Sequence, residues 1–435
     1  MYFSTIIKQL IGCSERYGNR IYLLVILLFL TGGLVYSLYL GNTLRFPDER
    51  LYLSIAKNIA LGNGYSFDGL KPTAFLPPIY PLVLAVFFKA GLSIPAIRYL
   101  NFIYLALCLV VIRSILRHEK AENGTMIASV LLLAYGVLFY TAGTFYPQTL
   151  FTLCLLLIVR VAVSRFGFIS ALCFGALSAL IILIHGTGVF VPPVVALWLF
   201  FNAGRKIDVI KKLSVSLLVA LLCISLWTFR NYTAFHRFIP LTTHGGDTLY
   251  IGNNPHTTLS AWYNYVNDDC YKEASRLPEP DQNSYYIRRT IEFWTGHPLQ
   301  AIKLYLEKLI EYFNFRNNLC VTKEFNTWRS ILMFITYYPL LMCLVIRLLY
   351  IKKYPMASLE WMLLSLYIVS ALFHALFLPR IRFRLPYDVL LIAFIGYMFA
   401  LVARNYPQIG LACKQTGPAY GNDTNVVKNQ ISPED

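Results

Sequence analysis

Repeated long apolar runs dominate this sequence and limit what it can fold into. A membrane-spanning helix needs about 20 mostly apolar residues. Ten runs meet or nearly meet that length: residues 21–40, 98–116, 125–143, 147–164, 168–184, 187–201, 213–229, 331–350, 359–378 and 387–404. We therefore predict an all-α polytopic membrane protein, a bundle of about ten transmembrane helices with a range of about nine to twelve.

The composition favours the same class. Of the 435 residues, 57% are hydrophobic and 14% are charged, whereas a soluble domain carries about 25% charged residues. Tyr and Phe occur 31 and 30 times, and aromatic side chains of this kind suit the headgroup level of a bilayer. The net charge of +16 follows from the positive-inside rule and from anionic lipid, so it does not indicate nucleic acid as a partner.

The distribution of Lys and Arg sets the predicted orientation. With the N-terminus inside, the basic short loops fall in the cytoplasm, and the outer turns at 144–146 and 185–186 carry no Lys or Arg. This works only if residues 79–92, an apolar run after Pro77 and Pro78, lie in the membrane interface as a short helix instead of crossing. We predict a multi-pass protein of the bacterial cytoplasmic membrane with its site facing the exterior.

The chain then divides into five regions. We expect the functional residues in the outer segments, because loops between membrane helices are usually short unless they bind or react with a ligand. The regions are a cytoplasmic N-terminus (1–20), an N-terminal transmembrane region (21–229) containing the first outer loop (41–78), a large outer loop (230–330), C-terminal helices (331–404) and a cytoplasmic tail expected to be disordered (405–435). A third, short outer segment, 379–386, is rich in Arg.

The first outer loop places two adjacent acids at the head of a predicted helix. We expect this helix to run from Asp48 or Glu49 to about Ala60, because Gly62 and Gly64 follow it. Its face of Tyr52, Ile55, Ala56 and Ile59 is expected to lie on the membrane. The acids would serve as a helix cap and a dipole partner, or as a base that takes the proton of a sugar acceptor.

The third outer segment carries candidate phosphate ligands. Residues 379–391 read PRIRFRLPYDVLL, and three Arg at an outer membrane edge oppose the positive-inside trend. We predict an extended run with the Arg side chains on one side. Arg382 and Arg384 would bind the phosphate of a lipid carrier bidentately, or extend to lipid headgroups. Lys71 and Arg230 are further, weaker cation candidates.

Several of these segments together resemble the C-fold (GT-C) glycosyltransferases. The segments are the run from Asp48 to Tyr65, the PPIYPLVLAVFF run at 77–88, the RNY, GG and GNNP pattern within 230–255, and the Arg run. The similarity is to the branch with protein O-mannosyltransferases and the lipid A aminoarabinose transferase. It implies Asp48 as the catalytic base, Glu49 as the second acid of the pair and Tyr52 as a substrate contact. It also implies a polyprenyl-phosphate-linked sugar donor and inversion at the transferred sugar.

The sequence departs from that family at two positions. Gln148 lies where relatives often carry a Glu, and His185 lies where many carry an Arg. We consider both as candidates for substrate binding. Gln148 would bind through hydrogen bonds, and His185 would bind as a protonated cation, unless it serves only as a helix cap. We predict no cofactor and no metal site, because the His residues of the large outer loop do not have the spacing in sequence that is typical of metal ligands.

Two other functions remain as alternatives to the transferase. A transporter or flippase of lipid-linked intermediates would be expected to show internal repeats and ionisable groups near the midplane. A polysaccharide polymerase or ligase would use a large outer loop through Arg and His, without an acidic pair in the first loop. For the transferase, the predicted partners are the lipid-linked donor, membrane lipid, and a glycolipid, polysaccharide or protein acceptor. The sequence does not name the sugar or the acceptor.

Overall fold

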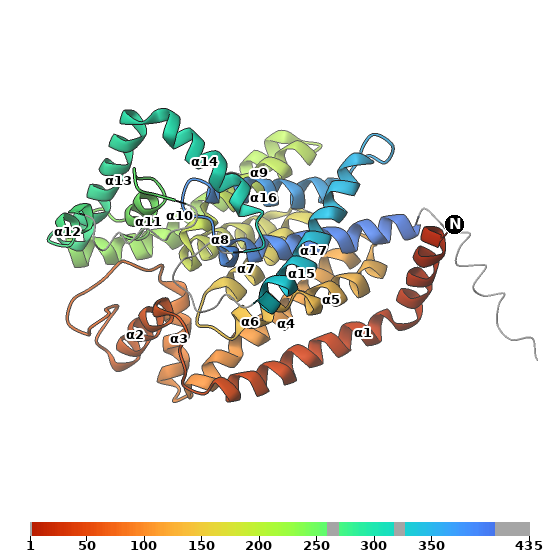
Figure 1. The fold of residues 1–435 in the computed structure, drawn as a ribbon, viewed down its shortest axis with the longest axis horizontal. Helices are drawn as coiled ribbons and strands as arrows, with labels where there is room; N and C mark the ends of the chain where they lie inside the picture. The colour runs from red at the N-terminus through yellow and green to blue at the C-terminus, as the bar shows by residue number, and fades with distance from the viewer. Residues whose placement is uncertain (1, 259–268, 317–326, 405–435) are drawn as a thin grey trace, which may run out of the picture.

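The computed structural model describes residues 2–258, 269–316 and 327–404, and the regular elements in these residues are helices, with one isolated bridge between Ser66 and Pro72. Several of the long helices run lengthwise in an elongated molecule (Figure 1). The tail predicted at 405–435 lies outside the described residues, as do 259–268 and 317–326 of the large outer loop.

Each of the ten predicted runs is helical, but two of them, 125–143 and 187–201, are each divided between two helices, and the helices differ in length. Five are long and apolar enough to cross a membrane: α1 (Tyr2–Leu40), α4 (Ile94–His118), α10 (Lys206–Phe235), α15 (Thr327–Leu349) and α17 (Ile381–Arg404). A sixth span is formed if α5 (Thr125–Ala134) and α6 (Gly136–Ala142), bent by 64° at their junction, are taken together.

The remaining predicted runs form shorter apolar helices. They are α7 (Gln148–Val163), α8 (Phe168–Ile184), the 3-10 helix η2 (Gly186–Phe190) continuing into α9 (Val191–Asn202), and α16 (Ser358–His374). A helix of about 17 residues is about 25 Å long, less than the roughly 30 Å of a bilayer core. A multi-pass membrane protein with five to six candidate spans follows from length and composition, and the full number of ten remains a prediction.

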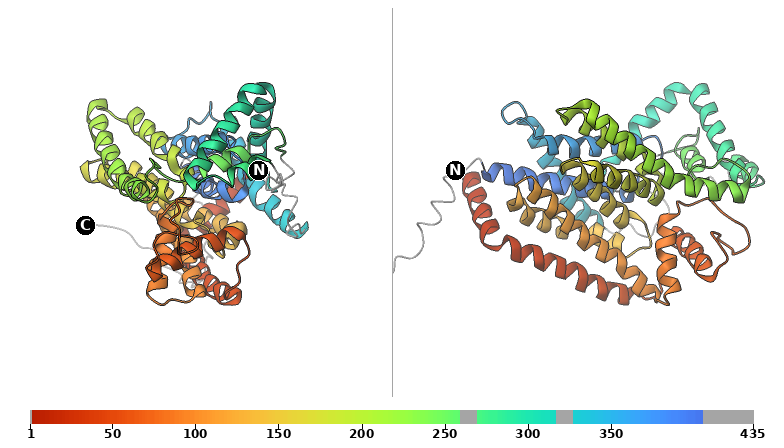
Figure 2. Two further views of the ribbon diagram at one scale, coloured as in Figure 1. Left: turned by 90° about the vertical axis from the view of Figure 1, so that its left-hand side faces the viewer. Right: turned by 180° about the vertical axis from the view of Figure 1, so that it is seen from behind.

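The loops predicted on opposite sides of the membrane lie at opposite ends of the molecule. At the end away from the N-terminus, α2 (Pro47–Leu61), α3 (Ile79–Lys89), α11 (Gly245–Ile251), α12 (Asp269–Ala274) and α13 (Glu279–Gly296) gather, and α14 (Pro298–Tyr312) leads back from them (Figures 1 and 2). At the other end, Arg404 donates to the carbonyls of Glu119 and Lys120 beside η1 (Glu122–Gly124). We call the first of these the outer end; its exposure to the exterior is a prediction.

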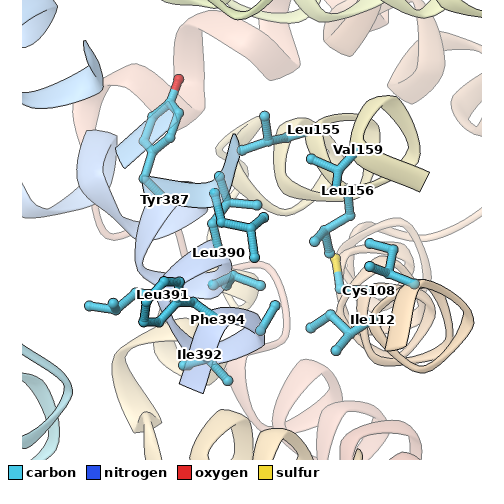
Figure 3. Close-up of a cluster of buried hydrophobic side chains, with 14 of the residues drawn as sticks. Cys108, Ile112, Leu155, Leu156, Val159, Tyr387, Leu390, Leu391, Ile392 and Phe394 are labelled. Carbon is cyan, nitrogen blue, oxygen red and sulfur yellow. The ribbon is translucent and has the colours of Figure 1, made fainter. Parts of the chain in front are cut away.

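Helix α17 lies at the centre of the bundle. Its Leu390, Leu391 and Phe394 pack in one cluster with side chains of α4 and α7 (Figure 3). Of the most apolar stretch of α17, 78% of the residues are buried, whereas the corresponding stretch of α10 is 11% buried. Leucines such as Leu221 and Leu226 of α10 therefore point outward, where lipid is the expected solvent. The dense packing of α17 fixes the position of its first turn, which carries Arg382.

Helix α2 starts at Pro47, a residue suited to the first helical position, and ends at Gly62, whose φ of +87° favours glycine. The expectation that its apolar face lies on the membrane is wrong. Tyr52 and Ile55 are buried, and the Tyr52 ring packs edge-on against Tyr80 of α3 at 5.3 Å between ring centroids. Because α3 folds back under α2, protein covers the face that lipid was expected to cover.

Candidate functional site

An ion pair joins the first outer loop to the start of α17. Asp48, in the first turn of α2, accepts from Arg382 at 2.8 Å between carboxylate oxygen and guanidinium nitrogen. Both side chains remain partly exposed, 41% for Asp48 and 25% for Arg382. The structure therefore brings together two candidates that the sequence separates by most of its length, and it leaves both accessible to a ligand.

Aromatic rings hold the Arg382 side chain in place. The guanidinium carbon lies 4.6 Å from the centroid of Tyr146 and 5.0 Å from that of Phe383, and its Nε is buried without a hydrogen-bond partner. Tyr52 lies close by and is also buried. Burial raises the pKa of the Tyr52 phenol and the Asp48 carboxylate raises it further, so the Tyr52 hydroxyl stays protonated and can donate a hydrogen bond.

A narrow hollow opens beside Arg382, between α7, η2 and α17. Its polar lining consists of Gln148, His185, Thr187 and Arg382, and prolines and phenylalanines form the rest. Gln148 opens α7 and is 6% exposed, and its Oε1 has no hydrogen-bond partner. Three of the residues predicted from the sequence, Gln148, His185 and Arg382, thus line one hollow. A fourth, Asp48, lies next to it through its ion pair with Arg382.

His185 caps the short η2 helix at the turn after α8. Its Nδ1 lies 2.8 Å from the Thr187 hydroxyl and accepts from the Thr187 backbone N–H. Burial lowers the pKa of His185 to about 3, with smaller contributions from His374, Arg382 and His244. A neutral imidazole does not supply the positive charge expected of a protonated His185, whereas the capping role matches the observed contacts.

Glu49 and Asp48 are adjacent in sequence but differ in their surroundings. Glu49 is 1% exposed. Its Oε1 accepts from the backbone N–H groups of Arg45 and Phe46, and its Oε2 from that of Phe145. These bonds close the entry to α2 and tie it to the turn before α7. With both oxygens occupied, Glu49 positions Asp48 and is not open to a substrate.

Arg384 is directed into the bundle, away from Arg382. The expectation of an extended Arg run is wrong, because α17 already begins at Ile381. In a helix, residues two apart diverge by about 200°. Arg384 is fully buried, pairs with Asp388 at 3.0 Å, and donates to the carbonyls of Tyr312 and Asn314. It holds α14 against α17 and does not reach the hollow beside Arg382.

The two weaker cation candidates lie away from the ion pair. Arg230 donates to the carbonyls of Thr73 and Tyr65, and so connects α10 to the first outer loop. Lys71 has an exposed side chain in a turn that Asp68 closes through backbone N–H groups. Neither side chain has a contact with Asp48 or Arg382 among the described residues.

Sequence reasoning missed three features of this region. Tyr146 and Phe383 support Arg382, and nothing in their local sequence sets them apart from other aromatic residues. Asp388 carried a visible signal, because an acid inside an apolar run and four residues after an Arg predicts a buried helical pair. Glu279, which accepts from Thr73 and Thr243 and joins the two outer loops, had no such signal.

The described residues contain no cluster of side chains suited to bind a metal ion. Across residues 2–258, 269–316 and 327–404, no group of three or more His, Cys, Asp or Glu side chains is placed to hold a metal ion. His244 of the large outer loop instead lies 2.7 Å from an Asp247 carboxylate oxygen.

Comparisons with known proteins give a structural likeness but no family match. A scan against protein-family models finds no match, and a search of curated proteins finds none. Among solved structures, the chain is similar to that of ArnT from Cupriavidus metallidurans bound to undecaprenyl phosphate. The TM-score is 0.42 at 12% sequence identity, over 91% of this chain and 81% of that chain. This likeness is too distant to transfer any residue's role, so the roles proposed below rest on the geometry of this chain.

Proposed function

We propose that the chain is a membrane glycosyltransferase that moves a sugar from a polyprenyl-phosphate-linked donor to a hydroxyl or amine of an acceptor. The acceptor class is a glycolipid, a polysaccharide or a protein, and the reaction takes place at the outer end of the bundle. The single observation that supports this most is the Asp48–Arg382 ion pair, half-exposed beside a hollow. A base and a phosphate ligand are the two groups that such a transfer requires.

Asp48 has the properties of a general base. Its carboxylate is partly exposed, and it lies in the first turn of α2, where it pairs with Arg382. The neighbouring Glu49 anchors this turn through three backbone N–H groups. The turn that carries Asp48 is thus held by backbone hydrogen bonds, while the Asp48 carboxylate itself contacts only Arg382 among the ion pairs of the described residues.

Arg382 has the properties of a phosphate ligand. The guanidinium group is planar and binds phosphate oxygens bidentately, and the Tyr146 and Phe383 rings fix its orientation. In the absence of donor, Asp48 neutralises it. A donor phosphate competes for Arg382 and releases the Asp48 carboxylate, so donor binding frees the base.

The reaction is then a single displacement. The acceptor oxygen or nitrogen attacks the anomeric carbon, and the bond from that carbon to the phosphate oxygen breaks. The acceptor's proton passes to Asp48, and the polyprenyl phosphate leaves as an anion stabilised by Arg382. One displacement inverts the configuration at the anomeric carbon.

The test is sugar transfer by the purified full chain in liposomes, with labelled polyprenyl-phosphate sugar and cell-envelope extract as the source of acceptor. Asp48→Asn is expected to lower the rate by about 10²- to 10⁴-fold, the range for loss of a general base. Asp208→Asn is the matched control, because Asp208 is an exposed acid in the first turn of α10 at the opposite end. Equal rates for Asp48→Asn and wild type would refute the assigned base.

A further inference from the structure

Gln148 presents an unsatisfied polar atom inside the protein. It lines the hollow beside Arg382 and also a second hollow deeper in the bundle, whose walls include Thr141, Thr149 and Leu385. Its side chain is more than nine-tenths buried, and its Oε1 has no hydrogen-bond partner. A buried acceptor without a partner is costly and uncommon in native proteins, so a ligand that donates a hydrogen bond here would remove that cost.

The chemistry of the hollow limits what that ligand can be. Among the described residues no acidic side chain lines it, and the one formal charge in that lining is Arg382, which pairs with Asp48 outside it. An ammonium group on a bound sugar would lose its hydration and gain no carboxylate in return. A neutral hydroxyl group does not meet this obstacle, and it can donate a hydrogen bond to the Gln148 oxygen.

We propose that Gln148 is a specificity-determining residue whose Oε1 accepts a hydrogen bond from a hydroxyl group of an uncharged sugar carried on polyprenyl phosphate. The site therefore selects neutral sugars over amino sugars. This proposal rests on the proposed transferase function and adds the chemical class of its donor. Thr187 of the same lining already contacts His185 through its hydroxyl, whereas the Gln148 Oε1 has no partner that a sugar hydroxyl would have to displace.

The experiment measures equilibrium binding of three lipids to the full chain in nanodiscs, without acceptor. The lipids are polyprenyl phosphate alone, the same carrier with a neutral hexose, and the carrier with the hexose in which one hydroxyl is replaced by an amine. Wild type is expected to bind the hexose form about tenfold more tightly than the amino form, the size of one buried hydrogen bond. Gln148→Leu is expected to lose this preference, and Gln148→Glu to reverse it.

Two controls separate the outcomes. Gln300→Glu makes the same chemical change on an exposed part of α14 and is expected to keep the wild-type preference. Binding of the bare carrier is expected to be equal in wild type and Gln148→Leu. If wild type binds the carrier but does not distinguish the two sugars, or if Gln148→Leu keeps the preference, the role of Gln148 is overturned and the transferase stands. If wild type binds none of the three lipids, the transferase proposal fails, and this inference fails with it.

Discussion

Arg382 and Arg384 lie two residues apart in α17, and each pairs with an aspartate in a different environment. Arg384 and Asp388 are both buried, within one helix, four residues apart. Arg382 and Asp48 come from opposite parts of the sequence and are both partly exposed. The same two residue types thus form one pair closed to any ligand and one pair that a ligand can reach.

Hydrogen bonding explains why the two pairs differ in use. The Asp388 carboxylate also accepts from the phenols of Tyr135 and Tyr367, and the Arg384 guanidinium also donates to two backbone carbonyls. A buried pair of this kind is kept together by the cost of leaving either charge alone. In the described part of the chain, Arg382 has one ion-pair contact, with Asp48, and lies against the rings of Tyr146 and Phe383, so a phosphate can replace Asp48 at little cost.

Removal of the buried arginine is the change with the largest expected effect. Arg384→Leu leaves the Asp388 carboxylate without its countercharge and is expected to cost about 3–5 kcal/mol in the free energy of unfolding. The double variant with Asp388→Leu is expected to recover most of that loss, because no lone charge remains. Denaturant unfolding in detergent measures both. If Arg384→Leu alone were as stable as wild type, the Arg384–Asp388 pair would not stabilise the bundle.

The accessible pair is expected to respond in activity and not in stability. Arg382→Lys keeps the charge but loses the bidentate fork, and the rate of transfer is expected to fall about a hundredfold. The free energy of unfolding is expected to change by less than about 1 kcal/mol, as for exposed pairs. The assay is transfer from the lipid-linked donor alongside unfolding of the same sample. A loss of stability matching that of Arg384→Leu would remove the contrast between the pairs.

The positions of the helices could be predicted from the sequence, because apolar runs and their bounding Pro and Gly residues act locally. Pro47 and Gly62 mark α2 in both the sequence and the structure. The candidates Asp48 and Arg382 could also be named, since charges at predicted membrane edges are conspicuous. Their contact could not, because it depends on how distant helices pack.

The misplaced Arg384 has a definite physical cause. The alternate spacing of the Arg residues is the basis of the predicted extended run, and Pro386, which lacks an N–H group, normally disfavours helix at and before it. The dense packing of α17 overrides that preference, and the helix continues through Pro386. Because residues two apart in a helix diverge by about 200°, Arg382 and Arg384 lie on different sides of α17.

The adjacent acids of α2 provide a smaller test of the same contrast. Glu49→Gln exchanges one acceptor oxygen for an amide N–H that faces backbone donors, and is expected to cost about 1–2 kcal/mol of stability. The folded variant is expected to lose far less transfer activity than Asp48→Asn, because Asp48 is still present as the base. Thermal unfolding and the transfer assay on one preparation separate the two effects. Equal activity losses in the two variants would assign both acids to the reaction.

The smallest expected effect concerns His185, whose neutral form the fold prefers. Because its pKa is lowered to about 3 from an ordinary value of 6.5, the unfolded chain binds a proton below pH 6.5 that the folded chain does not. Its contribution to stability is therefore complete above pH 6.5 and is lost as the pH falls from 6.5 toward 3. His185→Asn is expected to show a smaller drop in melting temperature between pH 7.5 and 5.5 than wild type. His118→Asn, at an exposed position at the other end, is expected to keep the wild-type drop. The opposite result, a larger drop in His185→Asn, would mean that His185 is protonated beside Arg382 and contributes a second cation to the hollow.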